Sequence, residues 1–133
     1  MLKIKIIYIG KTKEQWIQEG IAEFEKRLTG DIALEWQLLK NDQELETVLS
    51  KEQKYTCLDP TGTTHTSESF SSFITKTANH TFVIGGPEGI PPHLKKNNIS
   101  FSKMTFTHQM IRLLLLEQLY RGIQIYKNTP YHK

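Results

Sequence analysis

The first strand is predicted at Lys3-Ile4-Lys5-Ile6-Ile7-Tyr8-Ile9-Gly10, and a helix follows it. Lysine alternates with isoleucine in its first half and apolar residues fill its second half, which is typical of a strand buried on both faces toward its end. Gly10 ends the strand, and Thr12-Lys13-Glu14-Gln15 matches a capping box at the start of a helix. One face of that helix would carry apolar side chains and a glycine, namely Trp16, Ile17, Gly20, Ile21, Phe24 and Leu28.

The same alternation continues along the chain. Further strands are expected at residues 32–39, 54–58, 80–84 and 98–101, and further helices at 41–50, 67–78 and 108–126. Asp59-Pro60-Thr61-Gly62 has the composition of a turn after the third strand. This spacing predicts an α/β fold with a mostly parallel sheet flanked by helices. No repeat or Pro/Gly/Ser-rich linker divides the sequence, so residues 1–133 are expected to form a single domain.

The composition narrows the class of protein. A chain of 133 residues, 38% of them hydrophobic, can bury a core without disulfides or a structural metal. Cys57 is the only cysteine, and no Cys/His spacing fits zinc. No apolar run is long enough for a signal peptide or a membrane span. A cytoplasmic protein of a reducing compartment is therefore expected.

The net charge of +3 conceals an asymmetry. Residues 1–90 contain ten basic and thirteen acidic side chains, whereas residues 91–133 contain seven basic and one acidic. A basic C-terminal third favours a polyanionic partner on one side of the molecule. The alternative, a solvated basic helix, stays open because the basic residues are spread rather than clustered.

Three loops are candidates for a ligand site, because ligands bind at the carboxyl ends of the strands in an open parallel sheet. They lie at residues 59–64, 85–89 and 102–107. Gly85-Gly86-Pro87-Glu88-Gly89 fits neither a P-loop nor a dinucleotide fingerprint, and a tight turn without a ligand explains it equally well. Phe101-Ser102-Lys103-Met104-Thr105-Phe106 contains no turn residues, which predicts a segment that is buried or wrapped around a flat ligand.

The helix at 108–126 is apolar around nearly its whole circumference. The residues responsible are Ile111, Leu113, Leu114, Leu115, Leu116, Leu119, Tyr120 and Ile123. Such a helix must be buried on every side, and a domain of this size offers little interior for it. A homodimer that packs through this helix is expected; a central helix in a monomer is the alternative.

An ordered set of motifs resembles the RlmH family, SPOUT-superfamily methyltransferases of bacterial large-subunit (23S) rRNA. The set comprises Ile84-Gly85-Gly86, Phe101-Ser102-Lys103-Met104-Thr105-Phe106, His108-Gln109-Met110, Glu117-Gln118-Leu119-Tyr120-Arg121 and the terminal Tyr131-His132-Lys133. Residues 3–13 and 20–28 also resemble the first strand and helix of the family, so the match extends over nearly the whole chain. The stretches between Leu39 and Tyr55 and between Gly89 and Phe101 are shorter than is usual in the family, and Thr107 replaces a frequent proline.

The resemblance implies one SPOUT domain with a C-terminal trefoil knot, acting as a homodimer. It implies methylation of N3 of a pseudouridine in helix 69 of 23S rRNA on the assembled ribosome, with no membrane, DNA or metal partner. S-adenosylmethionine would bind in the knot. By position, its contacts would be Leu58, Gly85, Phe101, Ser102, Lys103, Met104, Thr105 and Phe106. Apolar walls from such loops, with backbone groups that read an adenine edge, suit this cofactor.

Five residues are candidates for catalysis: His108, Arg121, Tyr131, His132 and Lys133. His108 lies in the first turn of a helix, where the dipole disfavours imidazolium, so it could accept the N3 proton; a helix-start residue without a role is equally open. Arg121 could hold a phosphate or a base carbonyl, although an ion pair with Glu117 one turn earlier is the ordinary explanation. The resemblance places the tail 131–133 near the cofactor, where Tyr131 could stack on a flipped base. No residue is identified as the general base.

Two other functions stay open. One is a non-catalytic RNA- or ribosome-binding factor that has kept the knot, and the other is a small α/β nucleotide-binding module without an RNA partner. Trp16 and Trp36 are expected to pack in the core, and Cys57 is expected to be buried and inert.

Overall fold

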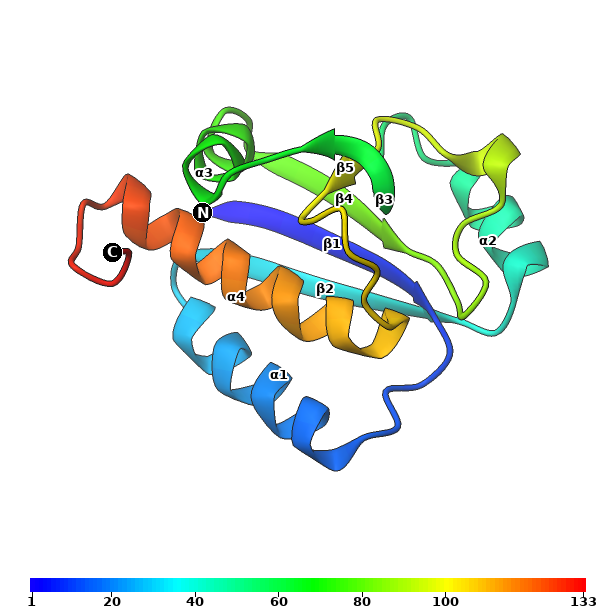
Figure 1. Cartoon of the computed structure of the whole chain (residues 1–133), viewed down its shortest axis with the longest axis horizontal. Coiled ribbons are helices and arrows are strands. Elements are labelled where there is room, and N and C mark those ends of the chain that lie inside the picture. The colour runs from blue at the N-terminus through cyan, green and yellow to red at the C-terminus, as the bar shows by residue number, and fades with distance from the viewer.

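Five parallel strands form one sheet, and four helices alternate with them along the chain (Figure 1). The computed structural model describes all of residues 1–133. The strands are β1 (Leu2–Ile9), β2 (Ile32–Leu39), β3 (Thr56–Thr64), β4 (Asn79–Ile84) and β5 (Ile99–Ser100), in the sheet order β2-β1-β4-β3-β5. The helices are α1 (Gln15–Leu28), α2 (Asp42–Leu49), α3 (Ser67–Thr75) and α4 (His108–Tyr126), with a short 3-10 turn at Pro92–Leu94. The predicted α/β class is confirmed.

The sheet has a core on each face, and β1 contributes to both. Ile4 and Ile6 belong to the larger core, which α1, α3 and α4 cover. Ile7 and Ile9 belong to the smaller core, which includes Leu45 and Leu49 of α2. Because α2 covers only the end of β1, the lysines in the first half of the strand stay near solvent. The predicted change from alternating to continuous burial is confirmed.

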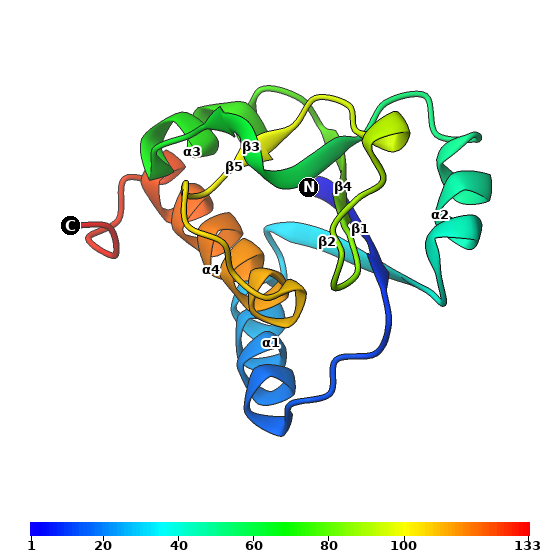
Figure 2. The same ribbon diagram turned by 45° about the vertical axis from the view of Figure 1, so that its right-hand side comes forward.

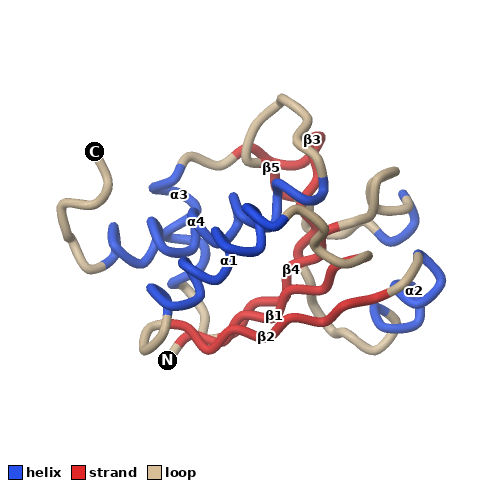
Figure 3. The backbone as a smooth tube through the Cα atoms, turned by 90° about the horizontal axis from the view of Figure 1, so that it is seen from below, coloured by secondary structure: helices blue, strands red, loops and turns tan.

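Helix α4 lies between two other helices. Figures 1 and 2 show it running beside α1, and its far end contacts α3. The three helices occupy the same side of the sheet, which Figure 3 shows edge-on. Six residues of α4 are buried, and the others from His108 to Ile125 are half-buried. The expectation of burial on every side is therefore met only in part, and one stripe of the helix stays accessible.

The start of α1 differs from the prediction. The helix begins at Gln15 after Glu14, and no side chain caps its first turn. The predicted capping box is wrong, because the Thr12 hydroxyl instead accepts a hydrogen bond from Arg112 of α4. A capping box does occur at α3, where Thr66 and Ser69 satisfy each other's backbone amides.

The predicted turn at residues 59–62 is also wrong. These residues lie within β3, whose register against β5 shifts between Leu58 and Thr63, so that both face Ile99. A Cβ on Gly62 would lie 2.6 Å from the carbonyl carbon of Asn98, so glycine is needed for this close approach of the two backbones. A bulge therefore replaces the turn, and it leaves Asp59 at the edge of the sheet.

The tryptophans and the cysteine have different environments. Trp16 is 56% exposed, which contradicts its expected place in the core. Trp36 is half-buried against Tyr8 and donates a hydrogen bond of 2.8 Å to Glu25. Cys57 is fully buried, as expected, and burial raises the pKa of its thiol. No helix has the length and apolar character needed to cross a membrane. The trefoil knot stays a prediction of the family resemblance.

Candidate functional site

A cavity of about 1220 Å³ lies beside the carboxyl ends of β4 and β5 and the bulge of β3. Its walls come from five parts of the chain: the entry to α1, residues 58–60, residues 84–90, Lys95 and residues 99–111. The three loops expected from the sequence all contribute to it. The rule that ligand sites form at this edge of a parallel sheet therefore located the cavity.

The residues predicted to bind the cofactor are brought together here. All of them except Lys103 line the cavity: Leu58, Gly85, Phe101, Ser102, Met104, Thr105 and Phe106. Lys103 is exposed on the same segment. Asp59 and Glu88, which belong to two of the predicted loops, also line the cavity, as do Glu14, Trp16 and Lys95, which lie outside those loops.

Gly85 is required by the backbone of the loop that it begins. A Cβ at this position would lie 2.6 Å from the carbonyl carbon of Gly89 and 2.7 Å from the amide nitrogen of Ile90. The turn closes through a hydrogen bond of 2.9 Å from the Gly89 amide to the Gly86 carbonyl, and Gly89 has a φ of +81°. The glycine sequence therefore builds a narrow turn, and this explains it without reference to a ligand.

Segment 101–106 forms one wall of the cavity. Its path is fixed by short-range hydrogen bonds, since the Ser100 hydroxyl donates to the Ser102 carbonyl at 2.6 Å and the Met104 amide donates to the Ser102 hydroxyl at 3.0 Å. Phe101 packs edge-on against Phe70 of the core. Met104 is 73% exposed and Phe106 is 37% exposed. The segment is therefore wrapped around the cavity rather than buried, with apolar side chains at its mouth.

An ion pair lies in the cavity wall at the bulge of β3. Asp59 Oδ1 is 3.1 Å from Lys95 Nζ, and Asp59 Oδ2 accepts hydrogen bonds from the amide and the hydroxyl of Thr61. Burial favours the protonated carboxyl, but the hydrogen bonds from Thr61 and Lys95 outweigh it and lower the pKa of Asp59. The sequence analysis included Asp59 in a candidate ligand loop but did not anticipate its pairing with Lys95, which lies 36 residues later.

His108 lines the cavity at the start of α4. Thr107 caps the helix, with its hydroxyl accepting a hydrogen bond of 3.1 Å from the Met110 amide, as its sequence predicts. Burial lowers the pKa of His108, and the positive charges of Arg112 and Lys13 lower it further. The imidazole is therefore neutral at neutral pH and able to accept a proton.

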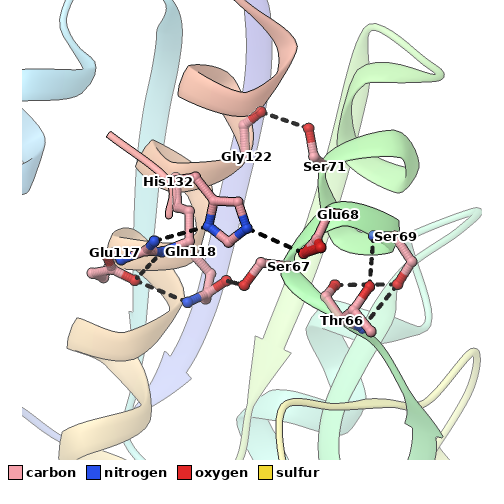
Figure 4. A network of polar contacts seen from close by, with 10 residues as sticks. Thr66, Ser67, Glu68, Ser69, Ser71, Glu117, Gln118, Gly122 and His132 are labelled. Atoms are coloured by element: carbon pink, nitrogen blue, oxygen red, sulfur yellow. Dashed lines mark hydrogen bonds and ion pairs between the residues drawn. The ribbon is translucent and has the colours of Figure 1, made fainter. Parts of the chain in front are cut away.

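Arg121, Tyr131 and His132 form a separate cluster toward the far end of α4, and Figure 4 shows His132 near Glu117 there. Lys133 follows the cluster and is exposed. Arg121 donates to Glu117 at 2.9 Å and lies 3.0 Å from Nδ1 of His132, whose Nε2 lies 3.3 Å from Glu68. Tyr131 donates its hydroxyl hydrogen to Glu117 at 2.8 Å, and its ring lies beneath the Arg121 guanidinium. The chain reverses at Asn128, which has a φ of +59°, and this turn folds the tail back onto the helix.

The pKa values of Arg121 and Tyr131 are both raised in this cluster. The bond from Arg121 to Glu117 raises the pKa of the guanidinium, and burial with the Glu117 contact raises the pKa of Tyr131. The cluster is thus an ordered network, not a frayed end. Both the pairing of Glu117 with Arg121 and the contact of Arg121 with the tail are present.

The cavity and the tail cluster do not meet within one chain. Arg121 follows His108 by thirteen positions on a continuous helix, which corresponds to about 20 Å. None of Arg121, Tyr131, His132 and Lys133 lines the cavity. Within one chain the tail therefore lies away from the cavity, and its expected place near the cofactor stays a prediction.

Comparisons with known proteins agree with this architecture. A family model described as a predicted SPOUT methyltransferase matches residues 2–132. Ribosomal RNA large subunit methyltransferase H of Protochlamydia amoebophila is 44% identical over 140 residues, covering 100% of both chains. The protein of that name from Streptococcus sanguinis is 36% identical over 159 residues, covering 99% of this chain and 100% of the relative. The latter alignment is longer than this chain, so the relative carries insertions. The chain belongs to the SPOUT methyltransferase family.

Proposed function

We propose that this protein transfers a methyl group from S-adenosylmethionine to N3 of a pseudouridine in helix 69 of 23S rRNA, on the assembled ribosome in the cytoplasm. The observation that carries the proposal is the cavity at the carboxyl edge of the sheet, with the neutral His108 in its wall. The relatives with full-length similarity are named as large-subunit rRNA methyltransferases, which supports an rRNA substrate.

The residues of the cavity fit S-adenosylmethionine. The apolar side chains of Leu58, Met104 and Phe106 can enclose an adenine ring, and backbone groups of residues 101–106 can bind its edge. The carboxylates of Glu14 and Glu88 line the same space and suit a ligand with a sulfonium and an ammonium charge. Small-molecule pockets usually measure roughly 300–1,000 Å³, so a cavity of about 1220 Å³ leaves room for a nucleoside beside the cofactor.

When bound, the cofactor supplies an activated methyl group, and the chain's task is to position the reactants and accept a proton. The imide proton of pseudouridine N3 must leave as the new N–C bond forms. His108 lines the cavity in its neutral form and can accept that proton. The exposed Met104 and Phe106 at the mouth can exclude water from the reacting atoms.

A homodimer would bring the second group of candidates to the reaction. The accessible stripe of α4 begins beside the cavity and ends at the tail cluster, and it includes the half-buried Ile111, Leu114 and Gln118. If two copies pack through this stripe in antiparallel orientation, the tail cluster of each lies at the cavity of the other. Arg121 and residues 131–133 would then contact the rRNA at the partner's cavity, where guanidinium and ammonium groups hold phosphate.

The test is transfer of labelled methyl from S-adenosylmethionine to ribosomes that lack the modification, followed by mass mapping of the rRNA. Label on N3 of one pseudouridine in helix 69 is the expected result. Label elsewhere, or cofactor binding without transfer, would contradict the assigned reaction. Free 23S rRNA and isolated large subunits serve as comparison substrates, because recognition of the assembled particle predicts that both are poorer acceptors.

A further inference from the structure

Arg112 is a fully buried arginine that forms no ion pair. Its side chain extends from α4 to the end of β1, where one terminal nitrogen donates to the Ile9 carbonyl at 2.7 Å and the other donates to the Thr12 hydroxyl at 2.9 Å. Its guanidinium carbon lies 4.7 Å from the centre of the Tyr8 ring, and its buried Nε has no hydrogen-bond partner. All the groups that contact this charge are thus neutral.

A buried arginine in this setting is not expected to stabilise the fold. Removing a guanidinium from water is costly, and only neutral oxygens and an aromatic face offset that cost here. An apolar side chain of similar volume would avoid the cost. We therefore ask which part of the chain the guanidinium holds in place.

Arg112 acts together with Gln109, which lies one turn earlier on α4. The Gln109 side chain accepts a hydrogen bond of 2.9 Å from the Lys13 amide and donates one of 3.1 Å to the Lys11 carbonyl. Together the two side chains fasten the chain between β1 and α1 at four points. The same loop leads directly to Glu14, Trp16 and Ile17, which line the cavity.

We propose that Arg112 is a positioning residue of the active site: with Gln109 it fixes the loop between β1 and α1 to the start of α4, and it places its uncompensated charge beside His108. The attachment of the loop holds the part of the cavity wall that contains Trp16 at a set distance from segment 101–106. The charge keeps the His108 imidazole available as a proton acceptor. The use of both effects in methyl transfer rests on the proposed function, whereas the loop and the imidazole can be observed without it.

The electrostatic setting of His108 includes charges from several elements. Burial is the first cause of its lowered pKa, followed by the charges of Arg112 on α4 and Lys13 on the loop. The other charged side chains lining the cavity are Glu14, Glu88 and the pair of Asp59 with Lys95. Asp59 is already compensated by Lys95, and Arg112 has a larger effect on the pKa of His108 than Lys13 does, so Arg112 is the charge to substitute.

Three variants separate the two effects. Arg112→Met removes the charge and the hydrogen bonds but keeps much of the volume. Arg112→Lys keeps the charge, but a single ammonium lacks the planar fork that reaches Ile9 and Thr12 together. Thr12→Val removes one hydrogen-bond partner and leaves the arginine in place. Arg27→Met is the matched control, because Arg27 is an exposed arginine of α1 paired with Glu23.

The readouts use the cofactor-free protein in a Trp36→Phe background, so that Trp16 is the only tryptophan. Fluorescence anisotropy decay of Trp16 reports the order of the loop, and NMR titration of labelled histidine reports the pKa of His108. Circular dichroism and urea unfolding establish that each variant is folded. Calorimetry with S-adenosylmethionine then measures the dissociation constant.

The expected results differ between variants. Arg112→Met increases the local motion of Trp16 and raises the pKa of His108, whereas Arg112→Lys and Thr12→Val increase the motion and leave the pKa low. If the loop is ordered in only about a tenth of the molecules, the dissociation constant of the cofactor rises about tenfold. Arg27→Met changes neither readout.

A folded Arg112→Met protein with unchanged Trp16 motion and an unchanged His108 pKa would overturn the proposal. If Arg112→Met does not fold, the outcome rests on Arg112→Lys and Thr12→Val, and unchanged Trp16 motion in both would overturn it equally. Failure of the proposed function has a different signature, because methyl transfer to the ribosome would then be absent in the unaltered protein while the loop and imidazole readouts still respond to Arg112.

Discussion

The hydroxyl of Ser71 donates a hydrogen bond of 2.6 Å to the backbone carbonyl of Gly122, and this contact joins α3 to α4 (Figure 4). The two helices meet closely here, since a Cβ on Gly122 would lie 2.9 Å from Ile74 Cδ1 and 3.4 Å from the Ser71 Cα. Both groups are buried. The contact sets the position of α4, which carries His108 at one end and Arg121 toward the other.

Ser71→Ala is expected to lower the free energy of unfolding by about 1 kcal/mol, because it removes the donor to a buried carbonyl. Urea unfolding monitored by circular dichroism measures the effect. Ser72→Ala is the matched control, since Ser72 is exposed on the same helix. An equal loss in both variants would show that serine-to-alanine replacement, not this contact, accounts for the change.

Gly85→Ala is expected to lower both stability and cofactor affinity, because its Cβ would overlap the backbone of Gly89 and Ile90. A larger side chain such as arginine at this position would therefore disrupt the turn as well as the cavity. Gly86→Ala places a Cβ at 3.6 Å from Ile9, an ordinary contact, so its free energy of unfolding should stay within about 0.5 kcal/mol of the unaltered protein. Equal stability of the two alanine variants, measured by urea unfolding, would show that the turn tolerates a side chain at residue 85.

Deletion of residues 131–133 is expected to preserve cofactor binding and to abolish methyl transfer. None of these residues lines the cavity of its own chain, so calorimetry should give an unchanged dissociation constant. Normal transfer by the shortened chain would show that the tail is not needed for the reaction.

Mixing two inactive variants is expected to restore activity if the site is shared between subunits. One variant lacks residues 131–133, and the other carries Met104→Arg, which adds a positive charge in the cavity wall at an exposed position. A mixed dimer of them contains one cavity and one tail that are both intact. Unfolding and refolding the mixture should therefore restore a measurable fraction of the activity, whereas a mixture that stays inactive would exclude a shared site.

The free energy of unfolding is expected to fall as the pH decreases below about 6.5, in part because of His80. Burial lowers the pKa of His80 although its Nε2 lies 2.9 Å from the Ile74 carbonyl. Between the lowered pKa and about 6.5, the unfolded chain binds more protons than the folded chain, so acid favours unfolding. Urea titrations at several pH values should show this slope, and His80→Gln should reduce it. An unchanged slope in that variant would assign the pH dependence to other groups.

The sequence predicted the sheet and the position of the cavity because both follow from local patterns. Residues 32–39 and 108–126 were predicted as elements with the bounds that the structure has, since apolar periodicity and flanking glycine or threonine define them. The parallel sheet then placed the bulge of β3 and the loops after β4 and β5 around one cavity. The family resemblance predicted which individual residues of these loops line the cavity.

The features that the sequence did not predict depend on contacts between segments that are distant in the sequence. Thr12 was read as a helix cap from its neighbours, but its hydroxyl is taken by Arg112, 100 residues later. Asp59 to Gly62 have the composition of a turn, yet they form a bulge within β3, because Leu58 before them and Thr63 after them both pair with Ile99 of β5. Trp16 lies on an amphipathic helix, yet it lines the cavity and is exposed instead of packing in the core.

The fastening of residues 9–13 to α4 has a consequence for how the protein is made. The Gln109 side chain bonds Lys11 across 98 residues of sequence, and the Arg112 side chain bonds Ile9 across 103. During synthesis β1 and α1 are complete long before α4 exists, so one wall of the cavity has nothing to hold it until the last helix is translated. Such long-range contacts also form slowly. A chain that is still being translated therefore lacks a complete cavity.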